Sequence, residues 1–145
     1  MMHDATRWLT ASALGVALIV GATALAQATQ EALDTQLATA TQHAEFAMNA
    51  DEHAAAVRHL GHVLNCIAGE GGEGFDGAWG HPCDGQGDGI MTDVAAHPQS
   101  ADVMLVVEAA HALAMQGVQA ESLGAVQAAA AGVRALLMVV ADFGG

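Results

Sequence analysis

The sequence predicts an all-α protein: a four-helix bundle made of two antiparallel helical hairpins, with a long glycine-rich loop between helices two and three. Apolar residues recur at three- and four-residue spacing in four segments. Short turns join the first segment to the second and the third to the fourth, which places the two helices of each pair side by side. Residues 69–99 lack this periodicity, so we expect them to connect the hairpins.

The first 26 residues have the composition of a secretory signal peptide. Arg7 precedes an uncharged run from Trp8 to Ala26, and Ala22, Ala24 and Ala26 offer small-residue cleavage sites. We therefore expect residues 1–26 to be removed and residues 27–145 to form one helical domain, periplasmic or secreted, without a stable membrane span. The alternative is an uncleaved membrane anchor, because the uncharged run approaches the ~20 residues that cross a bilayer.

The first hairpin is predicted from two amphipathic segments. Helix one is expected over 28–48, with Leu33, Leu37, Ala40, Ala44 and Met48 on its apolar face. Helix two is expected to start after an Asn49 cap and to run to residue 68, where glycine ends it. Its apolar face comprises Ala56, Val57, Leu60, Val63, Leu64 and Ile67.

The second hairpin is likewise predicted from two amphipathic segments. Helix three is expected to start near Ser100 and to stop at Gly117, with Val103, Val106, Val107, Ala110, Leu113 and Ala114 facing the core. Helix four is expected over 120–141, with Leu123, Val126, Ala130, Val133, Leu137 and Val140 on its face. Glu121 and Arg134 favour a core helix over a membrane span.

The connecting segment, residues 69–99, is unusual for its length and glycine content. It carries both prolines of the chain. Its apolar residues do not recur at helical or strand spacing. A long segment of this kind indicates a functional or ligand-ordered loop. Cys66 and Cys83 are the two cysteines of the chain, and an isolated pair in an oxidising compartment is expected to form a disulfide, worth on the order of 3 kcal/mol. A pair of metal thiolates is the alternative.

The charge of the chain excludes one class of partner. Its net charge is −13, and all three of its basic residues are arginines. Phosphate backbones would repel such a chain, so we expect no nucleic-acid binding, whereas cations would be attracted. The motifs of covalent haem attachment, zinc proteases, serine hydrolases and phosphate-binding loops are missing from the sequence, so we expect no enzymatic activity.

Histidines supply the clearest functional pattern. His59, His62 and Cys66 form one stripe on helix two, at spacings of three and four residues. A disulfide from Cys66 to Cys83 would fold the acidic loop over this stripe. Two imidazoles at this spacing can reach one metal ion, and His43 on helix one and His81 in the loop are candidate further ligands. Alternatively, His59 and His62 hydrogen-bond the loop and hold it in place.

Two further patterns carry weaker functional hypotheses. Met104, His111 and Met115 form a stripe on helix three that suits soft metals such as Cu(I), or packs against a neighbouring helix. Asp84, Asp88 and Asp93 resemble part of a calcium loop, although the glutamate expected at the end of an EF-hand loop is missing. A plain acidic turn is the alternative, and the sequence favours it over a calcium site.

Two stretches resemble known groups of proteins. The run from Gln42 to Ala47 and the run His53-Ala-Ala-Ala-Val-Arg-His59-Leu-Gly-His62 resemble the small periplasmic histidine-rich helical metal-binding proteins. That resemblance implies binding of several divalent metals, copper among them. The segments 59–69 and 82–89 also resemble a pattern in uncharacterised exported bacterial proteins, which implies that the helix-two stripe and the loop belong together.

These observations support three hypotheses about function. The first is an exported metal-binding or metal-buffering protein that holds copper, zinc or nickel at the histidines of helix two under the acidic loop. The second is an electron carrier or sensor with non-covalent haem b, ligated by His59 with His43 or His111. The third is a structural or interaction module whose loop is ordered by the disulfide and by calcium, with an unknown protein partner.

Overall fold

The structure, a computed structural model, describes the backbone of residues 10–96 and 100–143 and the side chains from residue 27 on. These residues form five helices and no strand: α1 (Thr10–Met48), α2 (His53–Ala68), α3 (Ile90–Ala95), α4 (Ser100–Gly117) and α5 (Leu123–Phe143). The all-α prediction is confirmed, and so is the disulfide between Cys66 and Cys83. Helix α3 lies inside the segment that the sequence predicts to be a loop.

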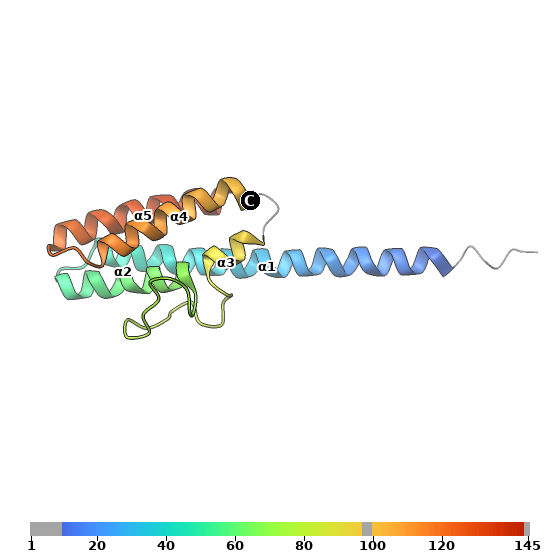
Figure 1. Cartoon of the computed structure of the whole chain (residues 1–145), viewed down its shortest axis with the longest axis horizontal. Coiled ribbons are helices and arrows are strands. Elements are labelled where there is room, and N and C mark those ends of the chain that lie inside the picture. Colours follow the sequence, from blue (N-terminus) through green and yellow to red (C-terminus); the bar gives the residue numbers. More distant parts are fainter. Residues whose placement is uncertain (1–9, 97–99, 144–145) are drawn as a thin grey trace, which may run out of the picture.

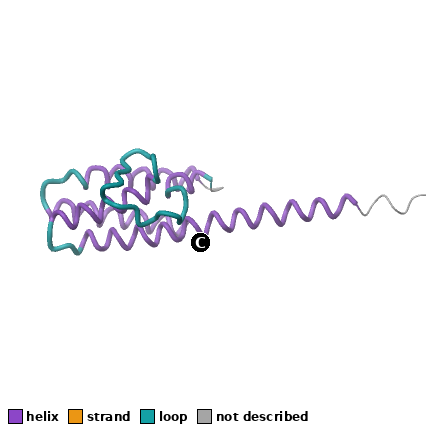
Figure 2. The backbone as a smooth tube through the Cα atoms, turned by 90° about the horizontal axis from the view of Figure 1, so that it is seen from below, coloured by secondary structure: helices purple, strands orange, loops and turns teal. Residues whose placement is uncertain are grey.

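The four long helices run alongside one another, and each follows its predecessor in the opposite direction (Figure 1). Helix α1 packs against α2 and α5, and α4 packs against α5 and α2. The loop that follows α2 lies on the outer side of α2 (Figure 1). In the view from below, this loop lies in front of the helices (Figure 2). This arrangement leaves one side of the α1–α2 pair covered by loop rather than by helix.

The core is formed by the predicted apolar faces. Its buried members include Leu33, Leu37, Ala40 and Ala44 of α1, Leu60, Leu64 and Ile67 of α2, Val103, Val107 and Ala110 of α4, and Val126, Val133 and Leu137 of α5. Small residues let the helices approach closely. A Cβ atom at Gly117 would lie 2.5 Å from Leu60 and 2.6 Å from Ala129, so this glycine is required where α4 turns towards α5.

Helix α1 is longer than predicted. It begins at Thr10 rather than at residue 28 and runs without a break through the expected cleavage region, and its N-terminal part projects beyond the other helices (Figure 1). The reason is local: the run after Trp8 is rich in alanine and leucine, which are strong helix formers. Residues 1–9, with Arg7, lie outside the described residues, and cleavage near residue 26 stays a prediction.

Several helix ends also differ from the predictions. Asn49 does not cap α2: its side-chain amide donates to the Glu45 carbonyl at 2.9 Å, and Glu52 precedes the helix without a side-chain cap. Gly69 ends α2 at a positive φ of 71°, as expected of glycine, with its backbone N–H donating to Asn65. Helix α3 exists because Ile90 and Val94, four residues apart, are both fully buried.

One helix of the described part, α5, is long and apolar enough to cross a membrane by length and composition alone. In the structure its buried residues, such as Val133 and Leu137, belong to the core shared with the other helices. A core helix passes the same test of length and composition as a membrane span. The packing of α5 therefore accounts for its apolar face, although Met138, Val139 and Phe143 remain exposed.

Candidate metal centre

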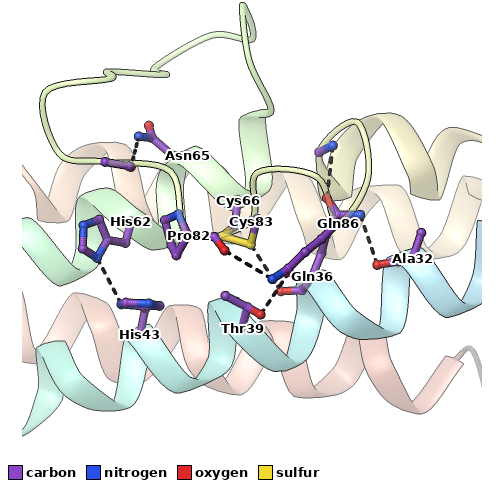
Figure 3. Close-up of a disulfide and its surroundings, with 12 residues drawn as sticks. Ala32, Gln36, Thr39, His43, His62, Asn65, Cys66, Pro82, Cys83 and Gln86 are labelled. Carbon is purple, nitrogen blue, oxygen red and sulfur yellow. Dashed lines mark hydrogen bonds between the residues drawn. A yellow bond between two sulfur atoms is a disulfide. The ribbon is translucent and has the colours of Figure 1, made fainter.

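Three histidines from two helices converge beneath the loop. His43 lies on α1, and His59 and His62 lie on α2, the antiparallel neighbour of α1. One ligand nitrogen from each ring lies within 4.8 Å of the other two. His43 and His62 face each other across the two helices, next to the disulfide (Figure 3). We call these three residues the histidine triad.

Two of the three nitrogen–nitrogen distances within the triad are close to those of nitrogens that share a metal ion. The Nδ1 atom of His43 lies 3.3 Å from Nδ1 of His59 and 3.1 Å from Nδ1 of His62. A tetrahedral zinc ion with bonds of about 2.0–2.1 Å separates its ligand nitrogens by about 3.3–3.4 Å. One neutral imidazole nitrogen carries either a proton or a lone pair, so a proton between two of the rings leaves the third unpaired. A metal ion satisfies all three at once.

A loop carbonyl fixes the orientation of His62. The Nε2 atom of His62 lies 2.5 Å from the backbone oxygen of Trp79, and a carbonyl oxygen only accepts hydrogen bonds. His62 therefore carries its proton on Nε2, and in the neutral ring the lone pair is left on Nδ1, which faces His43. Metal-ligating histidines characteristically donate their other ring N–H to such a partner.

Burial favours the neutral form of each ring of the triad. It lowers the pKa of His43 from 6.5 to about 4, with further lowering by the charges that His62 and His59 would carry. Burial is also the largest cause of the lowered pKa of His59 and of His62, and the positive charge of Arg58 lowers both further. The hydrogen bond to Trp79 partly opposes this for His62. Neutral rings have lone pairs free to bind a metal ion.

Asn65 holds the loop in the position that the triad requires. This side chain is fully buried, and its amide donates to the carbonyls of Asp76 at 2.8 Å and Gly80 at 2.7 Å while its oxygen accepts from the Asp76 N–H at 2.9 Å. The loop backbone on both sides of Trp79 is thus tied to α2. Asn65 is not among the residues predicted from the sequence, although its position three residues after His62 and directly before Cys66 places it on the loop-facing side of α2.

The disulfide and two small residues complete this closure. Cys66 and Cys83, with Cα atoms 5.3 Å apart, join the end of α2 to the loop, and both are buried (Figure 3). Gly61 leaves space for the Trp79 ring, because a Cβ atom there would lie 2.3 Å from it. Gly80 has a φ of 95°, which side-chain-bearing residues rarely adopt, and it lies against His62.

The other predicted ligands lie elsewhere. His81 is outside the triad and packs its ring on Phe75, with the ring centroids 5.1 Å apart. Asp84 and Asp88 are exposed, whereas Asp93 is buried and accepts hydrogen bonds from Gln36 and from the backbone of Asp88. Within residues 27–96 and 100–143, these carboxylates do not form a group that could hold a metal ion.

The stripe on the third predicted helix, now part of α4, packs against its surroundings. His111 is buried and its Nε2 lies 2.8 Å from the Glu73 carbonyl. Met104 and Met115 are partly buried against the core, and Met115 also lies against Gly74 of the loop. These contacts match the packing interpretation of the stripe.

The triad also argues against the predicted haem ligation. Two axial histidines lie on opposite faces of a haem, with the porphyrin between them. The Nδ1 atoms of His43 and His59 are only 3.3 Å apart. His111, the other candidate partner, bonds a loop carbonyl. The geometry therefore favours a single bare metal ion over haem at this site.

Comparison of the chain with protein-family models, with curated proteins and with solved structures finds no match. The resemblance to periplasmic histidine-rich metal-binding proteins therefore stays a prediction. The case for a metal centre rests on the triad itself: three histidines close enough to bind one metal ion.

Proposed function

We propose that this chain is an exported metal-binding protein, a four-helix bundle with one added short helix, whose histidine triad holds one late first-row metal ion. The observation that carries the proposal is the convergence of three imidazole nitrogens, two pairs of which lie 3.1 and 3.3 Å apart. The second supporting feature is the Trp79 carbonyl, which leaves the His62 lone pair facing the other two rings.

The donor set indicates which metals fit. Three neutral imidazoles suit zinc, copper and nickel, whereas calcium and magnesium prefer oxygen ligands. The cysteines are joined in a disulfide, so no thiolate from Cys66 or Cys83 is available. Binding and buffering of copper, zinc or nickel is the function that this chemistry supports best.

The disulfide also supports an oxidising compartment for the folded protein. Structural disulfides persist in periplasmic and extracellular proteins and are rare in the cytosol. Together with the signal-like composition of residues 1–26, this supports export to the periplasm or beyond the cell.

Equilibrium dialysis of the disulfide-intact protein against copper, zinc and nickel tests the proposal. We expect one tightly bound metal ion per chain, lost in the His59→Ala, His62→Ala double variant. His53→Ala is the matched control, because His53 is an exposed histidine of the same helix that bonds the Ala120 carbonyl instead of the triad. Equal stoichiometry in the wild type and the double variant would contradict the proposal.

A structural role is the second candidate, and one observation favours it. Three histidines lie within hydrogen-bond distance of loop carbonyls: His62 with Trp79, His111 with Glu73, and His53 with Ala120. If the triad only braces the loop, zinc and copper should leave the melting temperature of the protein unchanged. A specific metal site instead raises it with metal concentration, by mass action.

A further inference from the structure

The outer face of the α4–α5 pair is apolar, and no other described helix covers it. These two helices lie on the side of the bundle opposite α1 and α2 (Figure 1). Among the described residues, five large apolar side chains are exposed, and four of them belong to α4 and α5: Leu105, Met138, Val139 and Phe143. Leu105 is 70% exposed, the largest value of the five. Apolar side chains gathered on one surface indicate a contact with another molecule.

This face is also poor in acidic side chains, although the protein as a whole is acidic. Helix α5 has 21 residues, and Asp142, next to its end, is its one acidic residue. The acidic residues that adjoin the face lie at its two ends: Asp102 at the start of α4 and Glu121 in the α4–α5 turn. Two copies of the chain, each with a net charge of −13, therefore repel each other least where these faces meet.

One end of the α4–α5 face is hollow. A groove of about 400 Å³ lies between the two helices, next to the turn that joins them. Its lining is mostly apolar and includes Leu113, Gly117, Ala125 and Ala128. The glycine and the alanines leave space between α4 and α5 that larger side chains would fill. This groove can therefore accept apolar side chains from another molecule.

The other end of the face carries protruding side chains. Leu105 lies eleven residues, or three helical turns, before Gln116 of the groove, so both occupy the same side of α4. On α5, Val139 lies eleven residues after Ala128 and shares its side in the same way. Because α4 and α5 are antiparallel, Leu105 near the start of α4 and Val139 near the end of α5 lie together. The protruding end and the groove thus belong to one face.

A face with one protruding and one hollow end is complementary to a second copy of itself. In a two-fold dimer with antiparallel helices, the protruding end of each copy lies over the groove of the other. Between the two ends, the small residues Ala109 and Gly132 let the faces approach closely. Two neighbouring helices of this length offer a face of about 31 by 20 Å, or ~600 Å² per copy. The total of ~1,200 Å² reaches the lower limit of stable protein interfaces.

We propose that this chain forms a two-fold symmetric dimer through the outer faces of α4 and α5, with Leu105 and Val139 of each copy in the groove of the other. The inference does not use the histidine triad, which lies between α1 and α2 on the opposite side of the bundle. Metal binding and dimerisation therefore succeed or fail separately. The matched protruding and hollow ends favour a second copy over a lipid surface, which presents no such relief.

Sedimentation equilibrium of the full, disulfide-intact protein over a range of concentrations tests the proposal. We expect a reversible equilibrium of monomer and dimer without larger species, because a two-fold contact closes on itself. Added salt should lower the Kd, since it screens the repulsion between two acidic copies. Leu105→Glu at the protruding end and Ala128→Glu at the groove should each raise the Kd about a hundredfold, because symmetry repeats each change at two places.

The control adds the same charge on another side of the molecule. Ala38 is exposed on α1, away from the α4–α5 face, and Ala38→Glu should change the Kd by less than about threefold. All three substitutions are at exposed positions, so the helix content measured by circular dichroism should equal that of the wild type. Equal Kd increases in Ala38→Glu and Leu105→Glu would overturn the role of the protruding end.

Single cysteines test the antiparallel register. Ala109 lies near the proposed two-fold axis, so Ala109→Cys should cross-link to its own copy on oxidation, for which Cα atoms must lie within about 7 Å. Leu105→Cys should not, because antiparallel pairing separates its two copies by about 16 Å along the helices. Ala38→Cys measures the background of random cross-links. Stronger cross-linking of Leu105→Cys than of Ala109→Cys would overturn the proposed arrangement.

Three further outcomes would contradict the dimer. A monomer at every concentration would overturn it, and so would a monomer that pellets with phosphatidylcholine vesicles, which would assign the face to lipid. Association that survives both Leu105→Glu and Ala128→Glu would place the contact elsewhere, such as in the apolar run after Trp8. None of these outcomes bears on the histidine triad, whose metal stoichiometry is measured per chain.

Discussion

The four long helices α1, α2, α4 and α5, which we call the helical frame, and the loop between α2 and α3 are held in place by different kinds of contact. The frame is held by buried apolar side chains such as Leu60, Ile67 and Leu137, which are fully excluded from solvent. The loop contributes few buried apolar residues and is held by specific polar bonds and one covalent bridge. Apolar burial is additive and tolerant of exchange, whereas a hydrogen-bonded position depends on each partner.

The contrast extends to the polar residues of the core. Gln36 and Asn65 are both fully buried, and both serve the loop. Gln36 accepts from the Gly89 N–H at 3.1 Å and donates to Asp93, at the far end of the loop. Asn65 holds the near end, around Trp79. The two buried amides thus fix both ends of the loop to the frame, and the triad lies under the end held by Asn65.

The largest expected effect is on the frame. Leu60→Ala removes a fully buried side chain where α2 meets Gly117 of α4, and should lower the free energy of unfolding by about 2–5 kcal/mol. Metal affinity of the folded fraction should change little, because Leu60 bonds no part of the loop. Thermal unfolding and metal titration measure the two effects. If Leu60→Ala lost as much metal affinity as Asn65→Ala, the proposed difference between the helical frame and the loop would be contradicted.

Removal of the disulfide should affect both regions. The Cys66→Ala, Cys83→Ala double variant should lose about 3 kcal/mol of stability through greater freedom of the unfolded chain. It should also bind metal more weakly than Leu60→Ala at matched temperature, because the loop that carries the Trp79 carbonyl is released. Isothermal titration at a temperature where both variants are folded makes the comparison. Equal affinities would show that the bridge does not serve the triad.

Asn65→Ala isolates the polar contacts of the loop. It removes three hydrogen bonds and should lower the free energy of unfolding by about 1–3 kcal/mol. Because the Trp79 carbonyl orients His62, metal affinity should fall about 10–100-fold, the usual effect of losing an outer partner of a metal ligand. Asn49→Ala, which removes one exposed hydrogen bond to Glu45, is the control and should leave metal affinity unchanged.

The smallest expected effect is on pH dependence. In the folded protein the pKa of His43 is lowered from 6.5 to about 4, so the unfolded chain binds more protons in this interval. The contribution to stability is therefore complete above pH 6.5 and declines as the pH falls towards 4. Denaturant unfolding of the metal-free protein should show a smaller decline in His43→Ala than in the wild type. Parallel pH profiles would show that the triad is not desolvated.

The sequence predicts the frame well, because its apolar residues recur at helical spacing over many turns. Leu33, Leu37, Leu60 and Leu137 are buried as their spacing requires. Helix α3 is missed, since a single pair such as Ile90 and Val94 is too short to show a period. The start of α1 is missed because the apolar run after Trp8 is interpreted as a cleaved leader, a distinction that helix propensity does not make.

The site is only partly readable from the sequence. The i, i+3 pair His59 and His62 and the antiparallel hairpin point to His43, which the structure brings to the same place. The position of a loop residue is harder to predict. His81 is only two residues after Trp79, yet its ring packs on Phe75 and not against the triad. Loop conformation depends on backbone bonds to Asn65, and such bonds leave no periodic pattern in the sequence.

The bridge between Cys66 and Cys83 has a consequence for the order of events in a newly made chain. A reduced chain can already form the α1–α2 hairpin, but the loop that orients His62 is then held by hydrogen bonds, such as those of Asn65, without the covalent bridge. Oxidation would come first and firm capture of the metal second. If the triad holds a metal ion as proposed, a reduced polypeptide would release this ion more readily than the oxidised one, and disulfide formation would complete the site.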